Sequence, residues 1–497
     1  MKKLSKTLVI ALAAVMLLAG CKKESSEKKI LSFKFAAPAV EATISESAHT
    51  IVAVVPFGTN VTGLVPIITV SEKASVVPAS GTVVDFTNPV DFTVTAEDGS
   101  TVVYKATVTV DPNGGGGGGG GGTGDPTQIA GNIDANTTWP DLGLPVDYII
   151  DGWFYIEGNA LLTIEPGVTI MFTGTGGHID VGENAGLRMV GTADKPIRLV
   201  NPLNNDNPGA WRGITIHSNR NDNQFEYVEF INGGADEVAV VSVGGKLSMK
   251  HCLIDSGLGN GVELYYDGVF SAFENNTIKN VKYPLWVNDH KKVSILGSGN
   301  SYLNNTNNMI AVDCYYLDGG GNVTFKNQGI PYYIPVGINV CENSKMVVEP
   351  GVEIVFDYEK NFIVSEDSRL EVNGTASQPV IFRGKNADDP WYGIEFWSNR
   401  NGNIINYAKI MNCGMGDYGR DRCCLFIGNG AKLELTNNVF GPSNYNGVGI
   451  DNIESWGNVT HSGNSFQGCA GGNVYVFGGG YYNDEWYEDE TTLDELP

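Results

Sequence analysis

Residues 162–168 read Leu-Thr-Ile-Glu-Pro-Gly-Val, and residues 346–352 repeat the pattern as Met-Val-Val-Glu-Pro-Gly-Val. The repetition continues in the same order through Gly-Thr-Ala, Trp-x-Gly-Ile and Ser-Asn-Arg-Asn to Asn232 in the first copy and Asn412 in the second. The offset is 184 residues at the start of the unit (162 to 346) and 180 at its end (232 to 412). A long internal period is typical of repeat architectures, in which each unit buries its apolar face against its neighbours.

Short apolar stretches fill the chain from 127 to 480. They include 168–172, 187–190, 197–200 and 225–230, and glycine, asparagine or aspartate separates them. None of these stretches shows the period of a helix over a useful length. Strands this short, combined with a duplicated unit (162–232 and 346–412), predict a long parallel β-helix of about 14 coils.

The totals limit the classes of function. The chain has 497 residues, room for two or three domains, and a net charge of −24. A surface this acidic repels phosphate backbones, so nucleic acid is not an expected partner.

The N-terminus predicts export and a membrane anchor. Residues 1–20 carry three lysines and then an apolar run from Leu8 to Leu18, which is typical of a secretory signal. The segment ends Leu-Leu-Ala-Gly-Cys at 17–21, which resembles the bacterial lipobox. That resemblance implies that Cys21 is lipidated and holds the protein at the outer membrane, on its surface or its periplasmic side; the alternative is an ordinary signal peptide with a chance cysteine. Residues 21–29 are polar and predict a tether.

Residues 30–111 predict a β-sandwich, because apolar and polar residues alternate between regular turn signals. The segment from Ser80-Gly81 to Asp98-Gly99 resembles immunoglobulin-like modules at the base of Bacteroidetes surface lipoproteins, which implies a spacer. Nine consecutive glycines at 114–122 make residues 112–126 a flexible linker and the clearest domain boundary.

The repeated motifs of 162–232 and 346–412 resemble a β-helix unit common in secreted and surface bacterial proteins. The resemblance implies a right-handed parallel β-helix with the pectate-lyase-like fold over residues 127–480, so the whole chain is expected to be all-β. Residues 481–497 mix aromatic and acidic side chains, which fits either a cap on the last coil or a disordered tail.

Comparison of the two copies indicates which side chains face outward. Positions 214/216 and 394/396 are apolar in both copies and are expected inside, so 215/217 and 395/397 are expected outside. An outward aromatic ring beside a polar group suits a sugar ring; the alternative is a tryptophan that lies over a loop. The candidate binding residues are Trp391, Tyr392, Glu395 and Trp397 in the second copy, and Trp211 and His217 in the first.

No catalytic residue, metal site or cofactor is predicted. Residues 286–290 (Trp-Val-Asn-Asp-His) resemble a pectate-lyase segment but carry an inserted asparagine, and the polygalacturonase motifs are absent. Seven cysteines follow Cys21 without a paired Cys-x-x-Cys spacing, so at least one is unpaired and a zinc site is not expected, although one disulfide is possible.

Three functions are therefore open. The first is a non-catalytic envelope protein that binds extracellular polysaccharide or another macromolecule. The second is a polysaccharide lyase or glycoside hydrolase of the β-helix fold, and the third is a structural or adhesive envelope protein. A binder is expected to show exposed aromatic rings in a row, whereas an enzyme is expected to show carboxylates or basic groups converging in a groove.

Overall fold

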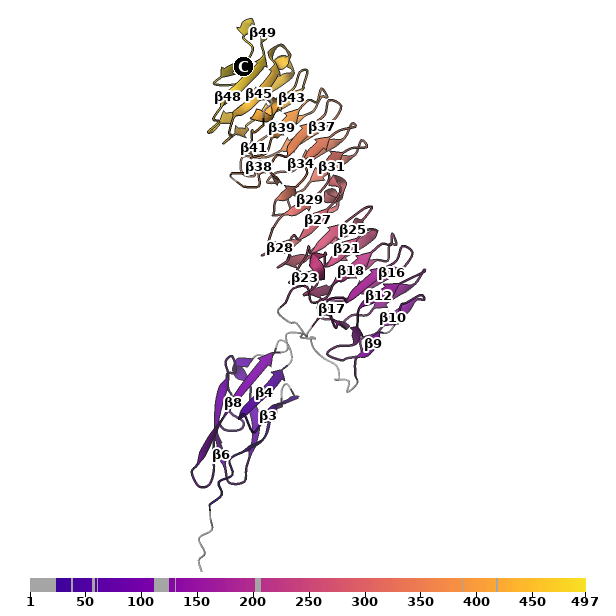
Figure 1. Ribbon diagram of the computed structural model, residues 1–497, viewed down its shortest axis with the longest axis vertical. Coiled ribbons are helices and arrows are strands. Elements are labelled where there is room, and N and C mark those ends of the chain that lie inside the picture. The colour runs from indigo at the N-terminus through magenta and orange to yellow at the C-terminus, as the bar shows by residue number, and fades with distance from the viewer. Residues whose placement is uncertain are drawn as a thin grey trace, which may run out of the picture. The chain divides into compact units, whose positions relative to one another are not determined.

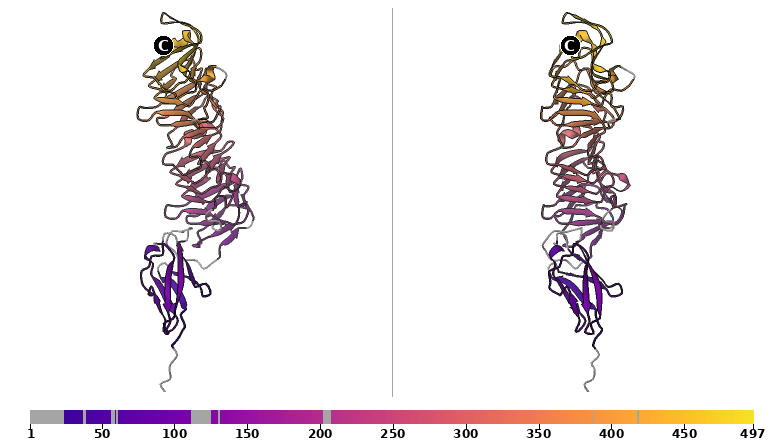
Figure 2. Two further views of the ribbon diagram at one scale, coloured as in Figure 1. Left: turned by 60° about the vertical axis from the view of Figure 1, so that its left-hand side comes forward. Right: turned by 90° about the vertical axis from the view of Figure 1, so that its left-hand side faces the viewer.

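The computed structural model describes residues 24–36, 39–55, 59, 61–110, 125–129, 131–201, 207–386, 388–416 and 419–497. It divides the chain into two compact units, residues 1–116 and 117–497 (Figures 1 and 2). Residues 21–23, which are Cys21 and the start of the expected tether, and all nine linker glycines lie outside the described residues. Within the part described, helix is confined to short 3₁₀ turns, and no helix is long and apolar enough to cross a membrane.

The N-terminal unit is built from two sheets, as the alternating pattern predicts. Its aromatic core includes Phe33, Phe35, Phe86 and Phe92, whose rings contact one another. The three-stranded sheet has the order β2 (Ala39–Glu41), β1 (Ile30–Ala36), β5 (Pro66–Val70). The five-stranded sheet has the order β3 (Thr43–Ser45), β4 (Thr50–Val55), β8 (Thr101–Val110), β7 (Val90–Thr95), β6 (Ser75–Val77), and η1 (Val61–Gly63) lies between β4 and β5 in the chain.

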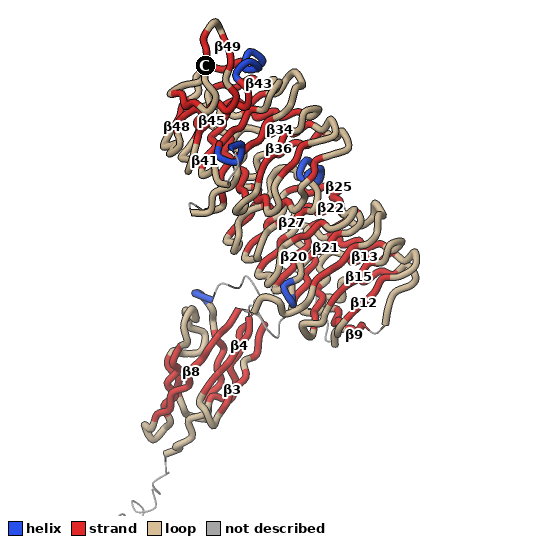
Figure 3. Tube along the Cα trace, turned by 45° about the horizontal axis from the view of Figure 1, so that its top comes forward, coloured by secondary structure: helices blue, strands red, loops and turns tan. Residues whose placement is uncertain are grey.

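The second unit is the expected parallel β-helix, in which successive coils place strands side by side in long parallel sheets (Figure 3). Sheet I contains β10 (Thr137–Trp139), β13 (Leu161–Ile164), β16 (Gly186–Val190), β19 (Gln224–Glu226), β22 (Lys246–Lys250) and β25 (Val269–Glu274). Sheet II contains β9 (Thr127–Ile129), β11 (Tyr148–Ile150), β14 (Thr169–Phe172), β17 (Ile197–Val200), β20 (Val228–Ile231), β23 (Leu253–Asp255), β26 (Thr277–Lys279) and β28 (Ser301–Leu303).

Sheet III is the longest, with 13 strands. They are β12 (Trp153–Ile156), β15 (His178–Val181), β18 (Gly213–Ile216), β21 (Val241–Val243), β24 (Val262–Leu264), β27 (Leu285–Val287), β29 (Ile310–Val312), β32 (Tyr332–Ile334), β35 (Glu353–Phe356), β38 (Val380–Gly384), β41 (Ala408–Met411), β44 (Val439–Phe440) and β47 (Ser465–Phe466).

Two further sheets belong to the C-terminal part of the β-helix. Sheet IV contains β30 (Tyr316–Leu317), β33 (Ile338–Val340), β36 (Asn361–Val364), β39 (Gly393–Phe396), β42 (Cys423–Ile427), β45 (Asn446–Asn452), β48 (Gly472–Gly478) and β51 (Thr491–Leu493). Sheet V contains β31 (Asn322–Phe325), β34 (Lys345–Val348), β37 (Arg369–Asn373), β40 (Ile404–Asn406), β43 (Leu433–Thr436) and β46 (Val459–Ser462).

The two copies of the duplicated unit use different sheets for the same strand. Sheet II ends at β28 and sheet IV begins at β30, and η4 (His290–Ile295) packs between β25 of sheet I and β31 of sheet V. A coil therefore runs through sheets I, II and III in the first copy, and through V, III and IV in the second. Consequently β18 lies in sheet III, whereas its equivalent β39 lies in sheet IV.

The end of the chain adds a cap. β51 runs antiparallel to β48, and the hairpin of β49 (Gly480–Tyr482) and β50 (Glu485–Tyr487) precedes it. The indole N–H of Trp456, in η6 (Ile453–Asn458), donates to the carbonyl of Pro497 at 2.9 Å. Residues 481–497 are thus folded onto the β-helix rather than extended away from it.

One disulfide joins Cys413 to Cys424, with Cα atoms 5.3 Å apart. The remaining described cysteines are free: Cys252, Cys314, Cys341, Cys423 and Cys469.

Candidate functional site

Four aromatic side chains form a row on the outer face of sheet IV. Ring centroids are 5.3 Å apart between Trp397 and Phe426, 5.7 Å between Phe426 and Phe477, and 4.6 Å between Phe477 and Tyr475. We call Trp397, Phe426, Phe477 and Tyr475 the aromatic row. It crosses from β39 to β48, and Phe426 is buried by its neighbours while the other three rings are half-buried. Because neighbouring side chains hold these rings in place, a ligand that stacks on their apolar faces causes little further loss of side-chain entropy.

Glycines give these rings their room. A Cβ at Gly428 would overlap the ring of Trp397, and one at Gly419 would overlap Phe477. On β45, a Cβ at Gly449 would come within 3.0 Å of Phe477. The row therefore depends on small residues of adjacent coils as well as on its own side chains.

A carboxylate lies beside the row. Glu395, two residues before Trp397, is only 7 % exposed, and the Nε of Arg420 lies 3.7 Å from its Oε2. Burial raises the pKa of Glu395, and the positive charge of Arg420 opposes that rise. Arg420 also approaches Asp421 at 3.8 Å. The arginine belongs to η5 (Gly419–Arg422), a turn that covers this part of β39.

The sequence predicts that Glu395 and Trp397 both point outward. Alternation along β39 does place both on the outer side, opposite the buried Ile394 and Phe396. Glu395 nevertheless differs from the expectation of an exposed group, because η5 covers it. Tyr392 is half-buried, with its ring 3.2 Å from the position of a Cβ on Gly416.

Trp391 and Trp211 are not surface residues, so the expectation that they contact a ligand is wrong. Both are fully buried at a corner of the coil, where each stacks on a phenylalanine of the preceding coil. Their indole N–H groups donate to the carbonyls of Met411 and Ile231 at 3.0 and 2.7 Å. Period-two alternation describes strands and does not extend to these corner residues.

His217 lies apart from the aromatic row, on the outer face of sheet III. Its Nε2 is 3.3 Å from Oδ2 of Asp180, and its Nδ1 is 3.1 Å from the hydroxyl of Tyr265. The structure therefore divides the six candidates into two core tryptophans, a group of three on or beside sheet IV, and one residue in a separate cluster.

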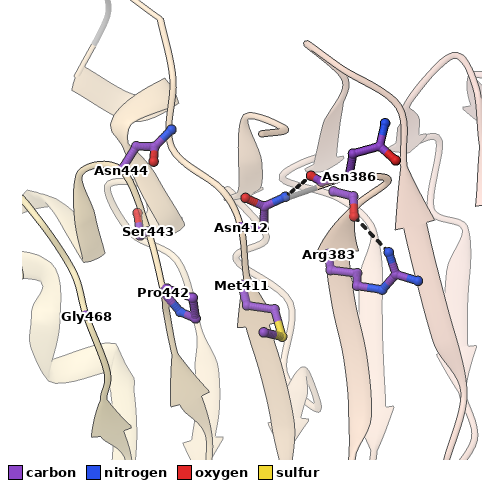
Figure 4. A pocket seen from close by; sticks show the side chains of 9 residues that line it. Arg383, Asn386, Met411, Asn412, Pro442, Ser443, Asn444 and Gly468 are labelled. Carbon is purple, nitrogen blue, oxygen red and sulfur yellow. Dashed lines mark hydrogen bonds between the residues drawn. The ribbon is translucent and has the colours of Figure 1, made fainter. Parts of the chain in front are cut away.

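A cavity of about 530 Å³ opens where β38, β41 and β44 end (Figure 4). The amide of Asn412 donates to the backbone carbonyl of Asn386 across its rim (Figure 4). A second cavity of about 640 Å³ shares Asn444 with the first and includes Tyr358 and Tyr445. Amides and phenol rings are suitable partners for sugar hydroxyls and ring faces. The side chains lining the first cavity include Arg383, Asn386, Met411, Asn412 and Ser443.

Three members of the aromatic row were not among the sequence candidates. The segment 472–478 reads Gly-Asn-Val-Tyr-Val-Phe-Gly, so alternation does indicate that Tyr475 and Phe477 share a face opposite Val474 and Val476. The sequence does not show that this face is continuous with the face that carries Trp397, because Gly472 at the start of β48 comes 76 residues after Phe396 at the end of β39. Among the described residues no group of three histidine, cysteine or acidic side chains is arranged to hold a metal ion.

Part of each of the two units matches a known domain family. Residues 30–109 match the family described as SGBP, N-terminal. Residues 131–306 match the family described as pectate-lyase like beta helix domain. The chain thus contains one segment similar to the SGBP N-terminal domain and one similar to the pectate-lyase-like β-helix domain.

Two solved structures are similar to parts of this chain. One, from Bacteroides thetaiotaomicron and provisionally named a glycoside hydrolase, is 32 % identical over 18 % of this chain and 27 % of its own, with a TM-score of 0.16. The other, from Bacteroides fragilis and provisionally named a secreted protein, is 21 % identical over 18 % of this chain and 97 % of its own, with a TM-score of 0.14. No curated protein gives a significant match.

Proposed function

We propose that this protein is a lipid-anchored, non-catalytic protein of the bacterial cell surface that binds extracellular polysaccharide through the aromatic row of its β-helix. The observation that carries the proposal is the contact of Trp397, Phe426, Phe477 and Tyr475 across neighbouring coils. The row is less exposed than the one expected of a binder, but three of its rings are partly open on one face, which favours a binder over an enzyme.

The chemistry of the row suits a glycan. Sugar rings are apolar on their faces and hydroxylated at their edges, so they stack on aromatic rings and hydrogen-bond to groups beside them. Neighbouring strands of a sheet lie about 4.8 Å apart, so a chain lying across the strands meets a new coil at nearly every step. Arg420, whose side chain is half exposed beside the buried Glu395, supplies hydrogen-bond donors at this end of the row.

The N-terminal unit supports a role outside the cell membrane. It matches a domain family of glycan-binding proteins, and the sequence before it ends in a lipobox-like segment at Cys21. In this proposal Cys21 is the lipidated anchor, and the N-terminal domain and glycine linker hold the β-helix away from the membrane. The polysaccharide is then the principal partner on the outer side.

Binding is tested with the soluble form beginning at Ile30 and a panel of soluble β-glucan, xylan and mannan. We expect at least one glycan to retard the protein in affinity electrophoresis without release of oligosaccharides. Trp397→Ala should weaken this retardation at least tenfold. The control is Leu303→Ala, which removes an exposed apolar side chain from β28 in sheet II and should leave the retardation unchanged. Oligosaccharide products would overturn the non-catalytic part of the proposal, and unchanged binding by Trp397→Ala would overturn the site.

The anchor has its own test. Cys21→Ser should move the full-length protein from the membrane fraction to the soluble fraction of its host. A Cys423→Ser variant, altered at a buried free cysteine of the β-helix, should remain in the membrane fraction. Retention of the Cys21→Ser protein in the membrane would contradict lipid anchoring but leave glycan binding untouched.

A further inference from the structure

The first copy of the duplicated unit carries its own cluster at the position equivalent to the aromatic row. His217 and Trp397 are 180 residues apart in the sequence and occupy equivalent positions. Each directly follows the strand that begins at the glycine of the Trp-x-Gly-Ile motif (β18 and β39). In the first copy this outer face belongs to sheet III, because the sheets change between β28 and β30. The duplication thus produced two corresponding outer faces.

Three polar side chains of the first face form a continuous hydrogen-bonded chain. Asp180 on β15 lies 3.3 Å from one nitrogen of His217, and the hydroxyl of Tyr265, after β24, lies 3.1 Å from the other. The tyrosine reaches the histidine because Gly244 leaves space: a Cβ there would be 2.7 Å from the Tyr265 ring. The side chain of His217 is 40 % exposed, so the hydrogen-bonded chain is open to solvent at its middle member.

An aromatic platform stands beside this chain. Trp153, on β12, is 50 % exposed, and its ring lies 4.4 Å from that of the buried His178. The Arg212 guanidinium carbon is 5.6 Å from the centre of the same indole. The tryptophan is therefore fixed in place while half of it remains open. His178 precedes Asp180 on the same face of β15, so the platform and the hydrogen-bonded chain are adjacent.

We infer that Trp153, Asp180, His217 and Tyr265 form a second saccharide-binding site, which takes a neutral pyranose unit with its ring on the tryptophan and its hydroxyls on the polar chain. We call these four residues the Trp153 site. Aspartate, imidazole and phenol together accept and donate hydrogen bonds, as a vicinal pair of hydroxyls requires. A neutral sugar fits better than an acidic one, because Asp180 would repel a carboxylate and the charge of Arg212 is already paired with Asp236.

A second site changes the way in which the β-helix holds a polymer. The Trp153 site and the aromatic row lie on different sheets, so they engage separate segments of a glycan or two separate chains. Two linked contacts raise the apparent affinity for a long chain well above that for a short oligosaccharide. The inference rests on the proposed function only for the choice of neutral glycans as probes.

The test uses the soluble form beginning at Ile30 with the same β-glucan, xylan and mannan panel. Variants are Trp153→Ala, the milder Tyr265→Phe, Trp397→Ala and the double variant Trp153→Ala/Trp397→Ala. Ser242→Ala, on β21 of the same sheet, is the matched control. Thermal unfolding identifies any variant that fails to fold. We expect each single tryptophan variant to retain weakened binding, the double variant to lose it, and Tyr265→Phe to weaken binding severalfold.

The outcomes separate the two sites. If Trp397→Ala alone abolishes binding and Trp153→Ala and Tyr265→Phe change nothing, the Trp153 site is overturned and the aromatic row stands. If Trp153→Ala alone abolishes binding, the Trp153 site stands and the aromatic row is overturned. Failure of every glycan in the panel to retard the folded wild-type protein would overturn both. A weakening by Ser242→Ala equal to that by Tyr265→Phe would overturn the assignment of the polar chain.

Discussion

The indole of Trp391 lies parallel to the ring of Phe356, with centroids 4.2 Å and planes 5° apart. The first copy repeats this geometry with Trp211 and Phe172 at 4.4 Å and 4°. Both tryptophans are fully buried, and both donate their N–H to a carbonyl. The tryptophan of the duplicated motif is therefore the part of the motif that packs one coil on the preceding one.

We expect Trp391→Ala to lower the free energy of unfolding by about 3–5 kcal/mol, because it leaves a cavity and an unpaired carbonyl in the core. Trp397→Ala, which removes a half-buried ring, is the matched control and should cost about 1 kcal/mol. Urea unfolding followed by far-ultraviolet circular dichroism measures both. Equal losses in the two variants would contradict the division into a core and a surface tryptophan.

The glycine beneath Trp397 gives a second prediction. Gly428→Ala should displace the indole, because the added Cβ would overlap it, and should cost about 1–3 kcal/mol by overpacking. Glycan binding should weaken with it. Gly174→Ala, at a position where a Cβ meets nothing within 4 Å, should change neither quantity. Full retention of binding by Gly428→Ala would show that Trp397 need not keep this orientation.

A buried histidine makes the stability depend on pH. Burial lowers the pKa of His290 from its ordinary value of 6.5 to about 4. The folded chain therefore binds fewer protons than the unfolded chain between these values, and stability falls as the pH drops from 6.5 toward 4, by up to about 3 kcal/mol. His290→Phe should flatten this part of the pH profile. The check is the urea midpoint between pH 7.5 and 4.5 for the two proteins; parallel profiles would refute the assignment to His290.

The cysteines can be counted in solution. The soluble form beginning at Ile30 has seven cysteines, of which Cys413 and Cys424 are bonded. Denatured without reductant it should titrate five thiols, and after reduction seven. A disulfide that closes so short a loop contributes about 3 kcal/mol to the free energy of unfolding. A reducing agent should therefore destabilise the wild type and should leave the stability of Cys413→Ala/Cys424→Ala unchanged. Seven thiols before reduction would exclude the bond.

The fold follows from the sequence more fully than the site does. The repeated Glu-Pro-Gly-Val turns and the short alternating strands predict the parallel coils, and sheet III has 13 strands against about 14 expected coils. Alternation also places Ile394 inside and Trp397 outside. These are local properties of a strand, which a sequence pattern records directly.

The parts that were missed depend on neighbouring coils. The burial of Glu395 depends on η5, a turn that follows the duplicated unit, and the aromatic row joins β39 to β48 through β42 and β45. Trp391 was misplaced because it precedes its strand and turns inward at a corner. The repeated motifs also do not indicate that sheet II is replaced by sheet IV near η4. That change decides which sheet carries His217 in the first copy and Trp397 in the second.

The antiparallel strand at the end of sheet IV has a further consequence. A parallel ladder exposes at its last strand the same pattern of amides and carbonyls that every internal strand offers, so one molecule is a template on which the next can grow into a fibre. β51 meets β48 in the opposite direction and occupies that template. Deleting residues 488–497 would turn this end of the protein into a seed for polymerisation.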